Sequence, residues 1–167
     1  MKKLITTFAL STAMIIGTAA VGMAAVGDTI IGPEVPITDP DLGGHQEAPF
    51  SINDNNLMVW SGLDTTGFAD NEIFLYDGNT NTLTNISQND GLNDYSPVIN
   101  NNGEIVWYSE DGKIWLYDGT TTDITAVNGH VNQDNPQINE SGDVAYIAQS
   151  GPYKEVYFYD KSTQLTT

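Results

Sequence analysis

Three copies of one short phrase, set at a regular interval, constrain the fold of this chain more than any other feature of its sequence. In each copy a charged residue is followed by an aliphatic residue, an aromatic ring, a second apolar residue, tyrosine and aspartate. The copies are Glu72–Asp77, Lys113–Asp118 and Glu155–Asp160. Their tyrosines, Tyr76, Tyr117 and Tyr159, lie 41 and then 42 residues apart. A period near 40 residues is typical of arrays built from one repeated supersecondary unit.

Two further phrases flank each copy and divide every unit into four short strands. The preceding phrases are Ile52–Trp60, Ile99–Trp107 and Ile138–Tyr146, and the following ones are Leu83-Thr84, Ile124-Thr125 and Leu165-Thr166. Pro49, Pro97 and Pro136 are expected to open the first strand of each unit, because that position tolerates a missing N–H. The units are therefore predicted at residues 49–84, 97–125 and 136–167.

The Asn-x-x-Gly step in each unit predicts a tight turn into an apolar run. Gly103 and Gly142 are expected to adopt a positive φ, and Asn56 takes that place in the first unit. The run that follows is too continuous for a strand with one face in water, so we expect both faces to be buried. Two aromatic columns recur once per unit and are interpreted as core or inter-unit packing: Trp60, Trp107 and Tyr146, and Phe74, Trp115 and Tyr157.

The order of these phrases resembles the TolB-like (PD40, WD40-like) β-propeller repeat over about residues 34–167. That family places Asp shortly before the proline, which Asp94 and Asp134 match and Glu47 matches more loosely. The turn departs from the family's Ser-Pro-Asp-Gly, which suggests a divergent extracytoplasmic relative. The resemblance implies an all-β fold of about three four-stranded antiparallel blades, each of about 40 residues.

Three blades are fewer than the four to eight with which propellers typically close. The N-terminal extended segment, residues 26–48, contains Val35–Thr38, which resembles the last strand of a unit and could complete a blade. We therefore expect a partial propeller. Either the sequence is the front part of a longer ring, or copies of the chain associate as a homo-oligomer that completes one.

Residues 1–25 have the layout of a secretory signal peptide. Lys2 and Lys3 precede an apolar stretch that ends in small residues, with cleavage expected after Ala24 or Ala25. The alternative is a retained anchor, because the apolar stretch is almost long enough to span a bilayer. Cleavage predicts an extracytoplasmic protein, periplasmic or secreted, without a stable membrane anchor.

The charge balance limits the partners of such a protein. The chain carries 22 acidic residues against 5 lysines, has no arginine, and has a formal charge of -17. Nucleic acid is therefore excluded as a partner, because phosphate binding needs clustered basic side chains. The chain has no cysteine, which excludes thiol chemistry. A protein partner with a basic surface is favoured.

Propeller geometry predicts one acidic loop face, because the loops between the second and third strands lie beside the loops between blades. The binding residues expected there are Asp64, Asp70, Asp94, Glu110, Asp111, Asp134 and Tyr95. Further acids and aromatic residues share these loops: Asp39, Asp41, Glu47, Asp90, Phe68 and Tyr153. The alternative is a solvated rim that only keeps the protein soluble.

Calcium is the one metal that these oxygen-rich loops favour, with Asp64, Asp70, Asp90 and Asp94 as candidate ligands. Asp and Asn beside Gly are equally typical of turns, and the function requires no cofactor. His45 and His130 are interpreted as polar loop residues.

The sequence thus predicts an exported propeller module that binds or scaffolds a protein and has no catalysis of its own, since no nucleophile motif occurs. One alternative is a propeller hydrolase or lyase that uses carboxylates of the same face as acid and base. Another is a structural subunit that assembles through open blade edges.

Overall fold

The computed structural model describes residues 49–64, 69–88, 91–125 and 131–167. The predicted signal peptide, the segment 26–48 with its blade-completing strand, and the two histidines lie outside these residues. Within them, no helix is long and apolar enough to cross a membrane.

The described residues contain twelve strands, which form three separate four-stranded sheets. The first sheet contains β1 (Phe50–Ile52), β2 (Leu57–Asp64), β3 (Asp70–Asp77) and β4 (Thr82–Asn85). The second contains β5 (Asp94–Ile99), β6 (Ile105–Ser109), β7 (Ile114–Tyr117) and β8 (Thr121–Asp123). The third contains β9 (Val131–Ile138), β10 (Val144–Ser150), β11 (Tyr153–Asp160) and β12 (Leu165–Thr166).

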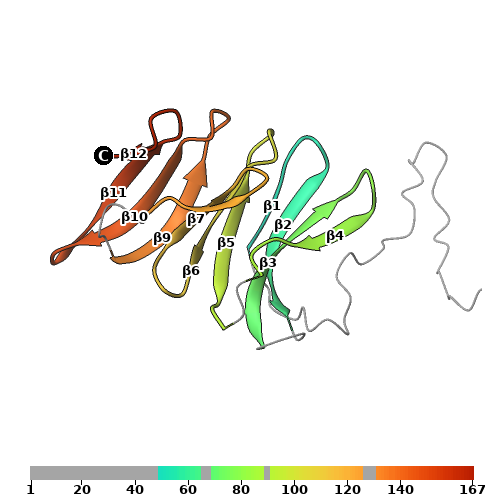
Figure 1. Cartoon of the computed structure of the whole chain (residues 1–167), viewed down its shortest axis with the longest axis horizontal. Coiled ribbons are helices and arrows are strands. Elements are labelled where there is room, and N and C mark those ends of the chain that lie inside the picture. The colour runs from blue at the N-terminus through green and yellow to red at the C-terminus, as the bar shows by residue number, and fades with distance from the viewer. Residues whose placement is uncertain (1–48, 65–68, 89–90, 126–130) are drawn as a thin grey trace, which may run out of the picture. The chain divides into compact units, whose positions relative to one another are not determined.

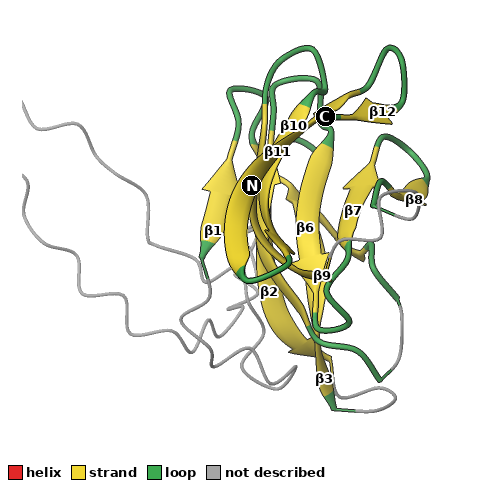
Figure 2. Cartoon of the chain, turned by 90° about the vertical axis from the view of Figure 1, so that its left-hand side faces the viewer, coloured by secondary structure: helices red, strands yellow, loops and turns green. Residues whose placement is uncertain are grey.

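In every sheet the strands are hydrogen-bonded antiparallel in chain order. The three sheets stand side by side in Figure 1, and Figure 2 shows strands and loops without a helix in the described part. The predicted all-β fold of three four-stranded antiparallel units is confirmed.

One asparagine shapes the turn between the first two strands of each sheet. The side-chain oxygen of Asn100 accepts the N–H groups of Asn102 and Glu104, both at 3.0 Å. Asn53 and Asn139 hold their own turns in the same way. The residue at the tight point has φ 81° in Gly103, 82° in Gly142 and 61° in Asn56, as predicted. The asparagine therefore replaces backbone partners that a tight turn lacks.

The predicted position of two prolines is wrong. Pro49 does directly precede β1, but Pro97 and Pro136 lie inside β5 and β9. In both strands the pairing register shifts at the proline, and the residue before it has φ near 50°. A bulge interrupts the ladder of hydrogen bonds, so a residue without an N–H is tolerated there as well as at a strand's start.

Each sheet has two chemically different faces, because side chains alternate along a strand. What we call the aromatic face carries Trp107 and Trp115 in the second sheet, and the aliphatic face carries Val106 and Leu116. The equivalent aromatic faces hold Trp60, Phe74 and Tyr76 in the first sheet and Tyr146, Tyr157 and Tyr159 in the third. The equivalent aliphatic face of the first sheet holds Val59, Ile73 and Leu75. That of the third sheet holds Ala145, Ile147, Val156 and Phe158.

The sheets pack aromatic face on aliphatic face, and the core lies in two layers between them. The first layer joins Val59 and Ile73 of the first sheet to Ile105 and Trp107 of the second. The second layer joins the aliphatic face of the second sheet to the aromatic face of the third, with these buried residues: Val106, Ile114, Leu116, Ile124, Val144, Tyr146, Ala148 and Tyr159. The packing role predicted for Trp107 and Tyr146 is confirmed.

The expectation of strands buried on both faces holds for the second sheet alone. Three consecutive residues of β6, Ile105, Val106 and Trp107, are fully buried. In β10 buried residues alternate with half-buried ones, and β2 is less evenly covered. The reason is position, because only the second sheet has a described sheet on either side.

Candidate interaction face

The predicted acidic loop face corresponds to one end of the sheets, opposite the asparagine turns and at the lower side of Figure 1. Asp64 and Asp70 pair in register where β2 meets β3. Glu110 and Asp111 lie in the turn between β6 and β7, and Asp134 lies in β9 opposite Ile147. The structure therefore brings predicted residues from all three sheets to the same end.

Two of these acids are not surface residues, so their predicted placement in exposed loops is wrong. Asp70 begins β3 and is 4% exposed, and Asp94 begins β5 and is fully buried. The N–H of Gly91 donates to the Asp70 carboxylate at 2.6 Å, and the Ser61 hydroxyl donates to the backbone oxygen of Asp94 at 2.5 Å. The contact from Ser61 joins the first sheet to the start of the second, so this segment stabilises the junction between the two sheets.

Glu72 is a third buried acid at this end, and sequence reasoning missed it. The Ser87 hydroxyl donates to its carboxylate and accepts the N–H of Ile73 at 2.9 Å. A charged residue opens every copy of the phrase, and nothing in the sequence sets Glu72 apart from Lys113, which is half-buried, or from Glu155, which is exposed.

Glu110 remains accessible and is held in place by the loop before β5. The Asn93 amide donates to the Glu110 carboxylate at 2.6 Å, and the Glu110 N–H donates to the Asn93 carbonyl at 2.8 Å. Asn93 in turn accepts the N–H of Asn71 at 3.0 Å. The exposed carboxylate is thus fixed by contacts that reach back to the first sheet.

Tyr95 lies beside this carboxylate. Its ring is tilted against Tyr108, with centroids 5.3 Å apart. Burial raises the pKa of the Tyr95 hydroxyl, and the nearby Glu110 charge raises it further. Tyr95 therefore stays neutral and offers a half-buried ring next to a fixed negative charge.

Two lysines that were not expected from the sequence also lie at this end of the sheets. Lys113 pairs with Asp111 at 2.6 Å and lies 5.5 Å from the Trp115 ring centroid. Burial would raise the pKa of the Asp111 carboxyl, but hydrogen bonds from Lys113 and Ser109 outweigh it and hold the pKa low. Lys154 pairs with Asp134, also at 2.6 Å. The face is therefore less negative than its acids alone predict.

No group of three or more acidic or histidine side chains able to hold a metal occurs among the residues that the structure describes. The candidate ligand Asp90 lies outside them, as do His45, His130 and Phe68. Calcium binding stays a prediction.

The opposite end of the sheets carries a repeated polar link that sequence reasoning missed. The Asn53 amide donates to the Asn100 carbonyl at 2.9 Å, and the Asn100 amide donates to the Asn139 carbonyl at 2.8 Å. We call these three residues the asparagine ladder. The sequence did contain a signal for the ladder, because an asparagine follows isoleucine at the same place in all three units. That asparagine was already accounted for by its role in the turn, so a second role between sheets was not predicted.

One ion-pair network strengthens the second junction at this end. Lys161 of the third sheet pairs with Glu104 at 2.5 Å and with Asp118 at 2.9 Å, both on the second sheet. Burial would raise the pKa of the Glu104 carboxyl, but hydrogen bonds from Lys161 and Asn100 outweigh it and lower the pKa. The first junction has Leu57 at the position of Glu104 and is apolar there.

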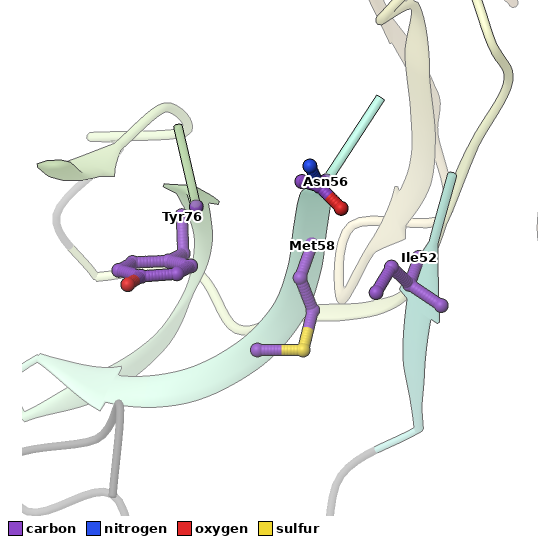
Figure 3. Close-up of a pocket in the computed structure, with 5 residues that line it drawn as sticks. Ile52, Asn56, Met58 and Tyr76 are labelled. Carbon is purple, nitrogen blue, oxygen red and sulfur yellow. The ribbon is translucent and has the colours of Figure 1, made fainter. Parts of the chain in front are cut away.

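A hollow of about 380 Å³ lies on the outward aromatic face of the first sheet. Its lining comes from β1, β2, β3 and the adjoining turns: Ile52, Asn56, Met58, Tyr76 and Gly78. Figure 3 shows Met58 between Ile52 and Tyr76, with the three side chains on neighbouring strands.

Comparison with known proteins supports the architecture. No family model and no curated protein matches the chain. A solved structure described as the β-propeller domain of the Trilobed protease from Pyrococcus furiosus, with an open velcro topology, matches with a TM-score of 0.54. The three sheets of this chain are propeller blades. The two chains are 17% identical, and the match covers 70% of this chain and 35% of the other, so the likeness shows the fold alone.

Proposed function

We propose that this chain is an exported, TolB-like propeller module that binds a basic protein through its acidic loop face and performs no catalysis itself. The observation that carries the proposal is the Glu110 carboxylate, which is exposed and yet held at 2.6 Å by Asn93 beside the Tyr95 ring. A fixed charge next to an aromatic surface can bind a lysine or arginine side chain without first losing conformational freedom.

The charge balance supports the same proposal. The described lysines pair with Asp111, Asp134, Glu104 and Asp118, and they are outnumbered by the carboxylates around them. Long-range attraction of a basic partner follows from this excess, and it weakens as salt screens the charges. Among the described residues, the accessible acids at this end that support the proposal are Asp64, Glu110, Asp111 and Asp134.

The test uses the double variant Asp64→Asn/Glu110→Gln and a lysine-rich peptide as the probe. We expect its affinity for the peptide to fall about fivefold in low salt, because two surface charges contribute about 1 kcal/mol together. The matched control is Asp54→Asn/Glu140→Gln, which removes two exposed acids at the opposite end and should retain more of the affinity.

Equal loss in both double variants would show attraction by net charge without a site, and the proposal would fail. A hydrolytic activity of the full chain that disappears with Asp64 and Glu110 would replace binding with catalysis. Calorimetric titration at two salt concentrations, with a substrate screen on the same samples, separates these outcomes.

A further inference from the structure

The two outward faces of the three-sheet array are the two halves of a junction that occurs twice inside it. Ile73, Ile114 and Val156 occupy the same position on the aliphatic faces of the three sheets. Ile73 and Ile114 are fully buried by the next sheet, whereas Val156 is 74% exposed. Phe158, two residues further along the same face, is 44% exposed. The third sheet therefore presents an aliphatic face of the kind that is covered in the other two.

The first sheet presents the complementary half. Ile99 lies on the covered aromatic face of the second sheet and is 7% exposed, whereas the equivalent Ile52 is 62% exposed. The hollow beside Ile52 corresponds to the place on the second sheet where Leu57 comes closest to Gly103. A side chain of the preceding sheet covers that place in the internal junction, and nothing in the described residues covers the hollow.

The asparagine ladder gives the direction of the next step. Asn100 donates one amide hydrogen to Glu104 in its own sheet and the other to the Asn139 carbonyl of the following sheet. Asn139 donates to Asp143 in its own sheet in the same manner. The second amide hydrogen of Asn139 is equivalent to the one by which Asn100 bonds to the next sheet. If the first sheet of another copy followed, the equivalent acceptor would be the backbone carbonyl of Asn53 in that copy.

We propose that a second copy of this chain packs the aromatic face of its first sheet against the aliphatic face of the third sheet, repeating the internal junction. Ile52 of the second copy would lie over Val156 and Phe158, and Asn139 would extend the asparagine ladder to the Asn53 carbonyl of that copy. The occupant is a second copy because each chain carries both halves of the junction, and the internal junctions already show how the halves fit.

Such contact is head-to-tail, so copies close into a ring or extend as a filament, depending on the rotation at each step. It uses the flat faces of the terminal sheets and leaves the acidic loop face open. It is therefore independent of the proposed binding of a basic protein, and either can fail without the other.

The test uses two variants that each block one face of the full chain. Val156→Lys blocks the aliphatic face of the third sheet, and Ile52→Lys blocks the aromatic face of the first. Both side chains are largely exposed, so folding is expected to survive, and circular dichroism checks it. Thr121→Lys is the control, an exposed residue in β8 with the same added charge.

Sedimentation velocity between about 1 and 100 μM measures the assembly. We expect the unsubstituted chain and Thr121→Lys to associate beyond the monomer, each blocked variant to stay monomeric, and an equimolar mixture of the two to form a dimer and stop there. Only a head-to-tail contact predicts that mixing the two variants restores the association that each of them lacks alone. Asn139→Asp retains the acceptor of the turn but loses the donor, and should weaken association about tenfold.

A chain that stays monomeric over the whole range overturns the proposal. So does a blocked variant that assembles as well as the control, which would indicate contact through strand edges or another surface. A mixture no heavier than its components would also contradict it, since the intact faces of the two variants should still fit.

Discussion

The second and third sheets carry similar residues at equivalent positions, but in the described part of the chain only the second has a sheet packed on both of its faces. Ile114 and Val156 both occupy the second position of the repeated phrase, and yet Ile114 is fully buried while Val156 is 74% exposed. The difference comes from neighbours and not from the repeat itself. In such an array a unit's contribution to stability depends on the units beside it.

The largest expected effect comes from truncating the two equivalent aliphatic residues. Ile114→Ala should lower the free energy of unfolding by about 2–5 kcal/mol, because it opens a cavity between the second and third sheets. Val156→Ala should change it by less than about 0.5 kcal/mol in dilute protein. Urea unfolding followed by tryptophan fluorescence measures both, and equal losses would contradict the packing described for the third sheet.

The asparagine ladder provides the next comparison. Asn100→Asp removes the donor to the Asn139 carbonyl and adds a charge beside Glu104, so we expect a loss of about 1–3 kcal/mol. Asn139→Asp makes the same chemical change beside Asp143, where the described structure has no following sheet, and should cost about 1 kcal/mol or less. The same urea titration compares them. A larger loss in Asn139→Asp at low protein concentration would be inconsistent with the ladder.

The ion pairs of the second junction should show in the pH dependence of stability. Lys161 lowers the pKa of Asp118 by its hydrogen bond, and Glu104 and Asp118 raise the pKa of Lys161 in return. Because their pKa values are lowered in the folded state, Glu104 and Asp118 stabilise the fold when the pH is above the ordinary pKa of a carboxyl group. This contribution is lost as the pH falls through their lowered pKa values. Because the pKa of Lys161 is raised in the folded state, its charge stabilises the fold when the pH is below the ordinary pKa of lysine. This contribution is lost as the pH rises through the raised pKa.

Lys161→Met should therefore cost about 1 kcal/mol between about pH 5 and 10, and little below about pH 3 or above about pH 11. Thermal unfolding of the variant and the unsubstituted chain across this range measures the difference. A cost independent of pH would mean that the lysine stem, and not its charge, stabilises the junction.

The smallest effect is expected for an ion pair within one sheet. Lys154 and Asp134 both belong to the third sheet, and the Lys154 side chain is 56% exposed. Lys154→Met should change stability by less than about 0.5 kcal/mol, and added salt should remove even that. A loss as large as that of Lys161→Met would mean that contact between sheets gives an ion pair no advantage here.

Local structure could be predicted from the sequence because its causes lie within a few residues. The turn at Asn100–Gly103 needs an asparagine to accept two nearby N–H groups and a glycine to take a positive φ, and both are visible in the phrase. The number and order of the strands followed from the same repeated signals. The bulge at Pro97 was missed because proline before a strand and proline within a bulge look alike in a sequence.

The candidate site was harder to predict, since burial depends on the neighbouring sheet. Asp94 was interpreted as an exposed loop acid because it stands among turn-forming residues, and yet Ser61 of the first sheet contacts its backbone. Lys113 and Lys154 neutralise acids on the face because the turn between β6 and β7 holds Lys113 beside Asp111, and the third sheet lets Lys154 of β11 reach across β10 to Asp134 of β9. The first contact joins residues two apart in one turn, whereas the second depends on strand pairing and does not follow from spacing along the chain.

Each sheet is made from one continuous stretch of chain, with its strands paired in the order in which they occur. Pairing therefore needs only short loops to close, which favours rapid formation of each sheet despite the all-β fold. A chain that emerges N-terminus first has all the strands of the first sheet once Asn85 is free, before the second sheet has begun. Its aliphatic face must then remain uncovered until residue 117 has followed, so the delay between successive repeats sets how long an aggregation-prone surface stays exposed.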